Sequence, residues 1–165
     1  MQGFVLPLRV LVACEYSGAV RDAFAARGHD AMSCDLLPTD RPGKHYQGDV
    51  RDVLDDGWDL MIAHPPCTYL TNAGARWLYD ERYPIRWQDM IDGATFFRAL
   101  LAAPIPRIAV ENPVMHGWAR KIVGSRQTQT IQPWMFGHPE TKATGLWLKG
   151  LPPLVATEDV RAVMD

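Results

Sequence analysis

A cysteine and a glutamate in this sequence each follow a short apolar segment and stand beside proline. Cys67 comes directly after Pro65-Pro66, and Glu111 is followed by Asn112-Pro113. Because proline fixes its own φ and restricts the preceding residue, both side chains sit on stiff backbone. A thiolate beside a carboxyl group is the pair that attacks an electron-poor pyrimidine, where sulfur adds to carbon 6 and carbon 5 then accepts a methyl group. We predict that Cys67 and Glu111 are catalytic.

The role expected of the carboxyl group is to hold the pyrimidine at ring N3 and its exocyclic amine. It would share a proton with the ring, which requires a raised pKa. The alternatives are an inert buried thiol and a surface ion-pair partner, and the proline-stiffened loops weigh against both. Substrate contacts are predicted for Pro66, Thr68 and Asn112, and also for Arg76 and Lys142. Cys14 and Cys34 lack a stiff presenting loop, so we expect them to pack in the core.

A carboxylate follows each of three further segments that are predicted to be strands. Glu15 follows the segment 9–13, Asp35 follows 29–34, and Asp49 follows Gln47-Gly48. Each could instead be a helix cap or a turn former. In a parallel sheet, however, all three would meet at the edge where ligands bind, with Asp35 placed for ribose hydroxyls and Asp49 for an adenine amino group.

The loop at residues 13–18 has no three-glycine dinucleotide fingerprint and no phosphate-binding Gly-Lys-Ser/Thr. Several carboxylates without a phosphate cradle suit a cationic nucleoside, and S-adenosylmethionine is such a ligand. The residues predicted to contact this cofactor are Glu15, Tyr16, Ser17, Gly18, Asp35, Leu36, Asp49, Val50 and Pro65.

Strand-like and helix-like segments alternate along the first two thirds of the chain. This pattern predicts an α/β, Rossmann-like fold with a mostly parallel twisted sheet and helices on both faces. Helices are expected from Val20 to about Gly28, over 85–102, and from Pro113 to Val123. Strands are expected at 9–13, 29–34, 47–50, 58–63, 107–110, 129–134 and 144–148.

Composition narrows the class of protein further. The 165 residues predict one domain, 1–165, and the formal net charge of −2 provides no broad basic field for nucleic acid, so such contacts must be local. Three separated cysteines and histidines without ligand spacing predict neither a disulfide framework nor a metal site. No apolar run reaches the ~20 residues of a membrane span. The N-terminal segment 1–9 lacks a leader pattern, which predicts a cytoplasmic protein.

The ordered motifs over about residues 9–150 resemble the DNA cytosine-5 methyltransferase family. Pro66-Cys67 resembles its catalytic Pro-Cys, Glu111-Asn112 its Glu-Asn, and Gly48-Asp49-Val50 its adenine-binding segment. The segment 136–142 is similar to its Gly-x-Pro-Gln-x-Arg motif. The resemblance implies S-adenosylmethionine as cofactor, a covalent adduct of Cys67 with cytosine carbon 6, and DNA as substrate.

The sequence differs from this family at defined positions. Pro113 replaces a valine, and Glu140, Lys142 and Thr144 stand where the family has Gln, Arg and Arg. No separate target-recognition domain follows the last motif. The chain is therefore similar to minimal, phage-type members of low sequence specificity, acting in a bacterium or a phage-infected host.

Aromatic and basic residues interleave after the Cys67 loop, as in a segment that binds a nucleic-acid strand. The target base would be flipped from a duplex or arrive single-stranded; the alternative is that the aromatics cap the core and the charges are solvated. The aromatic members are Tyr69, Trp77, Tyr79 and Tyr83, and the basic ones are Arg76, Arg82, Arg86, Lys121, Arg126 and Lys142.

Three other functions fit parts of the sequence. The first is methylation of a free cytidine nucleotide, which the small size and acidic balance favour. The second is a cofactor-binding half-subunit that needs a protein partner for recognition, or a homodimer. The third is amino-group methylation, because Pro65-Pro66 is similar to an Asp-Pro-Pro-Tyr loop. His64 and Cys67 occupy the positions where that loop has an acid or amide and an aromatic residue, so we rank it last.

Overall fold

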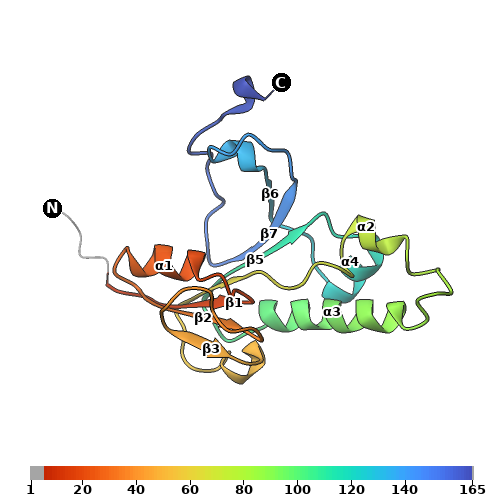
Figure 1. Cartoon of the computed structure of the whole chain (residues 1–165), viewed down its shortest axis with the longest axis horizontal. Helices are drawn as coiled ribbons and strands as arrows, with labels where there is room; N and C mark the ends of the chain where they lie inside the picture. The colour runs from red at the N-terminus through yellow and green to blue at the C-terminus, as the bar shows by residue number, and fades with distance from the viewer. Residues whose placement is uncertain (1–5, 165) are drawn as a thin grey trace.

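A single seven-stranded sheet organises the chain, as the computed structural model of residues 6–164 shows (Figure 1). Residues 1–5 of the N-terminal segment predicted to lack a leader lie outside this description, as does residue 165. The strands are β1 (Arg9–Ala13), β2 (Asp30–Asp35), β3 (His45–Gln47), β4 (Leu60–Ala63), β5 (Arg107–Pro113), β6 (Gln129–Ile131) and β7 (Thr144–Lys149).

The strand order is β3-β2-β1-β4-β5-β7-β6. Strands β1 to β5 run parallel, β7 pairs antiparallel with β5, and β6 pairs antiparallel with β7. From β1 the chain first builds outward to β3 and then returns to the other side of β1 with β4. Such a reversal opens a crevice beyond the carboxyl ends of β1 and β4, where open α/β sheets bind their ligands.

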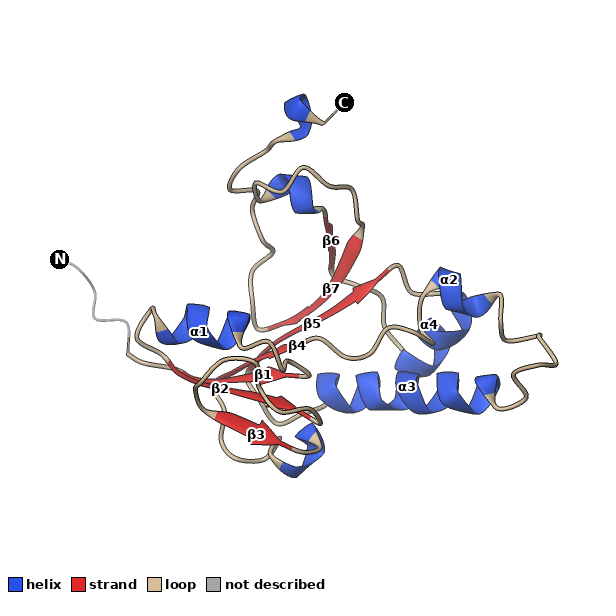
Figure 2. Ribbon diagram, in the orientation of Figure 1, coloured by secondary structure: helices blue, strands red, loops and turns tan. Residues whose placement is uncertain are grey.

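Helices cover both faces of the sheet, as predicted (Figure 2). Helix α1 (Ala19–Ala25) lies on one face, while α3 (Arg86–Leu101) and α4 (Gly117–Val123) pack together on the other, near the short α2 (Asn72–Ala75). Three 3₁₀ turns complete the described elements: Val50–Asp52, Pro133–Met135 and Arg161–Val163. Strand β6, the 3₁₀ turn Pro133–Met135 and the residues after β7 form an arm that rises away from the rest of the molecule in Figure 1.

The alternation of side chains along β1 builds a core on each face. Val10 and Val12 pack with Phe24 of α1 in the smaller cluster, whereas Leu11 and Ala13 belong to the larger cluster that contains α3. Because every side chain of a strand covered on both faces is buried, such strands read as continuous apolar runs. This explains why the inner strands could be recognised in the sequence.

Three predicted boundaries are wrong. The strand predicted at 47–50 is β3, which ends at Gln47, because Asp49 caps a 3₁₀ turn that begins at Val50. Pro113 does not begin a helix: β5 continues through Pro113 because it pairs with Thr144 of β7, and α4 begins only at Gly117, capped by His116. The predicted strand 129–134 ends at Ile131, since Pro133 begins a 3₁₀ turn and cannot donate to a strand ladder. The end of β5 at Pro113 is thus decided by its pairing with β7, a strand that is distant in the sequence.

Truncation of Phe97 tests the larger core. Its ring is fully buried and meets the Trp147 ring edge-on at 4.8 Å between centroids. We expect Phe97→Ala to lower the free energy of unfolding by about 3–5 kcal/mol, because it leaves a cavity. Denaturant unfolding followed by circular dichroism measures this, with Ile91→Ala on the exposed side of α3 as the matched control. Equal losses in the two variants would contradict the assignment.

Candidate active site at the carboxyl edge of the sheet

The parallel strands bring the predicted polar residues to one edge. Ala13 of β1 is in register with Cys34 of β2 and Ala63 of β4, and Ala63 is in register with Val110 of β5. The residues that follow these four therefore lie at the same level of the sheet. Those residues are Cys14, Asp35, His64 and Glu111.

A cavity of about 270 Å³ lies at this edge between β1, β2 and α3. Its wall contains four residues predicted for the cofactor, and Pro66 of the Cys67 loop closes one side. Five further lining residues were not predicted for this site: Cys14, Cys34, Gly48, Arg51 and Phe96. The predicted lining residues are Asp35, Leu36, Asp49 and Val50.

Asp49 is held by the residue two positions along the chain. Its carboxylate caps the 3₁₀ turn by accepting from the Arg51 backbone N–H at 2.9 Å, and it receives the Arg51 guanidinium at 2.9 and 2.5 Å. These hydrogen bonds lower the pKa of Asp49 below its usual value. The Arg51 guanidinium also lies 5.5 Å from the Phe96 ring centroid. Asp49 is therefore a fixed carboxylate in the cavity wall.

Cys14 is not the core residue that we predicted. It lines the cavity, is only partly buried, and has a φ of 58°, a left-handed conformation that is uncommon for a residue other than glycine. Cys34 is fully buried, as predicted. Burial, and next the charge of Asp35, raises the pKa of both thiols to about 12. Both therefore stay protonated at neutral pH and cannot act as thiolate nucleophiles.

A second cavity of about 310 Å³ adjoins the first through Cys14 and is lined by the loop after β1 and by His64. Glu15 lies in its wall, but its carboxylate is engaged with the start of α1. It accepts from the Val20 N–H at 2.6 Å, the Arg21 N–H at 3.2 Å and the Ser17 hydroxyl at 3.1 Å. Glu15 therefore orders this loop and brings negative charge to the positive end of the helix.

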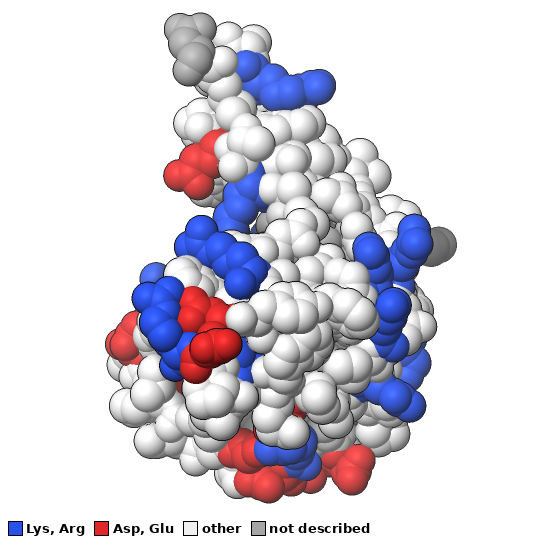
Figure 3. Space-filling model, turned by 90° about the vertical axis from the view of Figure 1, so that its right-hand side faces the viewer, with Lys and Arg blue, Asp and Glu red and all other residues white. Residues whose placement is uncertain are grey.

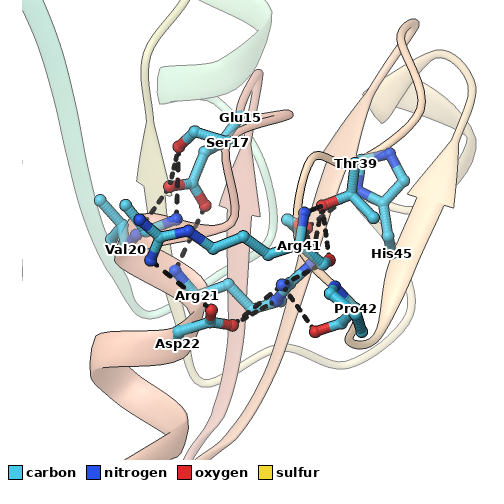
Figure 4. Close-up of polar contacts among 11 residues, drawn as sticks. Glu15, Ser17, Val20, Arg21, Asp22, Thr39, Arg41, Pro42 and His45 are labelled. Carbon is cyan, nitrogen blue, oxygen red and sulfur yellow. Dashed lines mark hydrogen bonds and ion pairs between the residues drawn. The ribbon is translucent and has the colours of Figure 1, made fainter.

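Arg21 of α1 is a buried charge that connects the start of this helix to the loop after β2 (Figure 4). Its five guanidinium N–H groups have five acceptors: the carboxylate of Asp22, the hydroxyls of Ser33 and Thr39, and the carbonyls of Arg41 and Pro42. Since a guanidinium has five donors, none is left unpaired. Arg21 thereby connects α1, β2 and the loop after Asp35.

Two glycines leave room for this guanidinium. A Cβ on Gly18 would lie 2.5 Å from Arg21 Nη2, and a Cβ on Gly43 would lie 2.6 Å from Arg21 Cζ. Gly18 also has a φ of 75°, which favours glycine. The requirement for glycine at position 18 thus comes from the backbone turn and from Arg21.

The Cys67 loop is held from two sides. The Cys67 carbonyl accepts from the N–H groups of Leu70 and Thr71, and the His116 N–H donates to the Leu70 carbonyl. On the opposite side, the Arg86 guanidinium donates to the Thr68 carbonyl at 3.2 Å. The thiol is partly exposed. Hydrogen bonds therefore restrain the backbone on which Cys67 lies. The sequence had indicated only the two prolines as the source of this rigidity.

Glu111 lies inside β5 and beside His64. Its carboxylate Oε2 is 3.4 Å from His64 Nδ1, and both side chains are 32% exposed. His64 Nε2 is buried without a partner among residues 6–164. Because side chains alternate along a strand, Asn112 points to the opposite face, where it is fully buried and donates to the Pro113 carbonyl at 2.6 Å. Glu111 and Asn112 are thus separated despite being neighbours.

Four other residues predicted to contact the cofactor or the substrate line neither cavity. Pro65 is buried behind Pro66 and lines neither cavity, and Thr68 is exposed on the Cys67 loop. Arg76 lies over the Trp77 ring at the end of α2. Lys142 is on the exposed segment before β7, with its backbone N–H bonded to Gln132. The two cavity walls therefore contain seven of the nine residues predicted for the cofactor, all but Gly18 and Pro65, and only Pro66 of those predicted for the substrate.

Charge is distributed unevenly around this edge. Figure 3 shows basic side chains in separate groups around a broad uncharged surface, with acidic side chains gathered at its rim. Within residues 6–164, no group of three His, Cys, Asp or Glu side chains is arranged to hold a metal ion. In the same residues, no helix has the length and apolar character needed to cross a membrane.

This chain is similar to known proteins in its three-dimensional structure and not in its sequence. No protein-family model matches the sequence, and no curated protein matches it. Monomeric WbdD superposes with a TM-score of 0.52 at 14% identity, over 93% of this chain and 38% of that one. Another structure of WbdD, a bifunctional kinase-methyltransferase, gives 0.51 at 13% identity, over 91% and 36% of the two chains.

A protein assigned as a DNA modification methyltransferase of an Escherichia coli prophage gives a TM-score of 0.50 at 16% identity, over 86% of this chain and 46% of that one. The chain thus spans less than half the length of each of these structures. At such identities the likeness shows the fold. The predicted Rossmann-like methyltransferase fold is confirmed by the strand order and by these structures.

Replacing Arg21 tests the support of the cavity loops. Arg21→Met keeps the length of the side chain but leaves two carbonyls and two hydroxyls without their donor. We expect the free energy of unfolding to fall by about 3 kcal/mol, with faster hydrogen exchange in residues 36–44. The matched control is Arg27→Met, because Arg27 is exposed and bonds only to the Ala23 carbonyl at 2.9 Å. Comparable effects of the two changes would disprove the role of Arg21.

Proposed function

We propose that this protein transfers a methyl group from S-adenosylmethionine to carbon 5 of cytosine, through a covalent adduct with Cys67. The observation that carries the proposal is the placement of a cavity lined by Asp35 and Asp49 against the Pro66-Cys67 loop. The methyltransferase fold shared with WbdD and the prophage protein supports the same chemistry.

The two cavities fit the parts of this cofactor. Leu36, Val50 and Phe96 give the first cavity apolar walls for an adenine ring, and Asp35 and Asp49 offer carboxylates for ribose hydroxyls and the adenine amine. The second cavity has Glu15 in its wall, whose negative charge suits a cationic amino-acid portion. Both cavities share Cys14, so one elongated ligand can occupy them together. The cofactor supplies the methyl group.

In the proposed reaction the Cys67 thiolate adds to cytosine carbon 6, forming a carbon–sulfur bond and making carbon 5 nucleophilic. Carbon 5 then takes the methyl group, while the sulfur–methyl bond of the sulfonium breaks and its electron pair stays on the departing thioether, S-adenosylhomocysteine. The carbon 5 proton leaves to a water molecule and the bond between the Cys67 sulfur and carbon 6 breaks, which restores the ring and the thiolate. Glu111 holds ring N3 and the exocyclic amine and shares a proton there. His64, 3.4 Å from Glu111, orients this carboxylate.

We assign DNA as the substrate class, read with low sequence specificity by a single catalytic domain over residues 1–165. The structural likeness to a prophage-encoded DNA modification methyltransferase supports this assignment and a phage-type origin. The loop from Tyr69 to Arg86 borders the Cys67 loop and carries basic and aromatic side chains. Cytoplasm is the compartment in which such a substrate and cofactor meet.

A second candidate is a subunit that needs a protein partner. The arm after β7 exposes three apolar side chains, Leu154, Val155 and Val163, at 48%, 79% and 70% of their surface. Exposed apolar side chains on a projecting segment are typical of association surfaces. Analytical ultracentrifugation separates the two cases: a stable monomer that methylates DNA alone would exclude an obligate partner.

Changing Cys67 tests the proposed nucleophile. We expect Cys67→Ser to abolish methyl transfer and the covalent adduct with 5-fluorocytosine DNA, because a serine hydroxyl is not ionised at neutral pH. Adduct formation is measured by denaturing gel electrophoresis, and cofactor affinity by calorimetry. The matched control is Thr95→Ser, an equally conservative change at an exposed position of α3 that lines neither cavity, and it should still form the adduct. An adduct that survives Cys67→Ser would exclude Cys67.

Changing Asp35 tests the proposed cofactor site. We expect Asp35→Asn to weaken S-adenosylmethionine binding about tenfold or more, since it replaces a charged acceptor of ribose hydrogen bonds. Isothermal titration calorimetry measures the affinity. Asp30→Asn, at the opposite end of the same strand, is the matched control and should bind as the unaltered protein does. If both variants bind equally well, the cofactor does not occupy this cavity.

A further inference from the structure

An aromatic patch lies beside the Cys67 loop, where the start of α3 meets α4. We define it as Tyr79, Trp87 and Trp118 together with the cations Arg86 and Lys121. Tyr79 meets Trp87 edge-on at 5.4 Å between ring centroids, and Trp87 meets Trp118 edge-on at 5.7 Å. The outer rings are open to solvent, since Tyr79 is 71% and Trp118 is 46% exposed.

Cations accompany these rings. Lys121 Nζ lies 4.6 Å from the Trp118 ring centroid, and the Arg86 guanidinium lies 4.3 Å from that of Tyr69. The loop between α2 and α3 repeats the pairing, because Trp77 and Tyr83 meet edge-on at 5.7 Å and Arg76 lies 4.5 Å from the Trp77 ring. Basic and aromatic side chains thus alternate along residues 76–87, and α4 adds Trp118 and Lys121 beside them.

The aromatic patch is joined directly to the proposed catalytic loop. Arg86 donates to the Thr68 carbonyl, one residue after Cys67, and also lies over Tyr69, two residues after it. His116, which caps α4 just before Trp118, bonds through its ring to the Tyr69 carbonyl at 2.9 Å. A ligand on the patch would therefore continue into the site where the cytosine reacts.

We propose that the aromatic patch binds unpaired bases flanking the target cytosine, so that the substrate is a single-stranded polynucleotide. This inference rests on the proposed function. Exposed rings stack on bases whose faces are free, and neighbouring cations neutralise the strand's phosphates. In a duplex those faces are stacked inside the helix, and binding then relies on phosphate neutralisation. A chain with a net charge of −2 provides little of that.

Direct binding of fluorescein-labelled 12-mers tests this proposal. Fluorescence anisotropy is measured at fixed salt for a cytosine-containing DNA strand, the same strand annealed to its complement, and its RNA equivalent. We expect a single strand to bind at least tenfold more tightly than the duplex. Tyr79→Ala and Trp118→Ala should each weaken strand binding about tenfold, as the loss of one stacked base does. The DNA and RNA strands show whether the sugar contributes.

The matched control is Trp134→Ala. Trp134 also lies under an arginine, Arg161, at 4.3 Å from its ring centroid, but it belongs to the arm and not to the aromatic patch. We expect its strand affinity to stay within twofold of the unaltered protein. Duplex binding equal to or tighter than strand binding overturns the proposal. So does an equal loss in all three variants, or self-association of the protein through the patch without strand binding.

The binding assay contains no cofactor, so it separates this inference from the proposed function. Strand binding that depends on Tyr79 and Trp118 upholds the inference even if no methyl group is transferred to any substrate. Conversely, methylation of free dCMP with no strand binding overturns the inference and leaves the methyltransferase chemistry intact. Circular dichroism spectra of the three variants confirm that each one is folded.

Discussion

The buried guanidinium of Arg21 is the interaction on which the cofactor side of this molecule depends. An ionised group removed from water is stable only when its donors are paired, and Arg21 pairs all five with the start of α1, with β2 and with the loop at residues 39–42. Glu15 caps the same helix from the other side. The two loops that border the cavities are therefore fixed relative to the sheet before any ligand binds, which reduces the ordering cost of binding.

The side of the edge that holds Glu111 depends on a different constraint, which is the pairing of β5 with β7. This antiparallel pair extends β5 to Pro113, so Glu111 and Asn112 belong to a regular strand and point to opposite faces. Glu111 therefore faces His64 at the edge, while Asn112 is enclosed by the core. The Cys67 loop obtains its own support from the His116 backbone N–H, which donates to the Leu70 carbonyl, and from the Arg86 guanidinium, which donates to the Thr68 carbonyl. Cys67 and Glu111 are thus anchored through separate elements.

The two sides of this edge differ in the chemistry of their surfaces. Fixed carboxylates line the cavity proposed for the cofactor, and their negative charge favours a cationic ligand there. Beyond the Cys67 loop, the surface changes to exposed aromatic rings with basic neighbours. Carboxylates thus line the edge on one side of the Cys67 loop, and aromatic and basic side chains lie on its other side.

The sequence by itself determined the alternation of strands and helices, because fully buried strands read as unbroken apolar runs whose carboxyl ends share one edge. It therefore identified Asp35, Asp49, Cys67 and Glu111 as residues of that edge. Only the tertiary structure decided which neighbours they meet. Antiparallel pairing moved Pro113 out of a helix, and Cys14 and Phe96 became cavity residues. Those outcomes depend on contacts between segments distant in the chain, which periodicity and spacing do not encode.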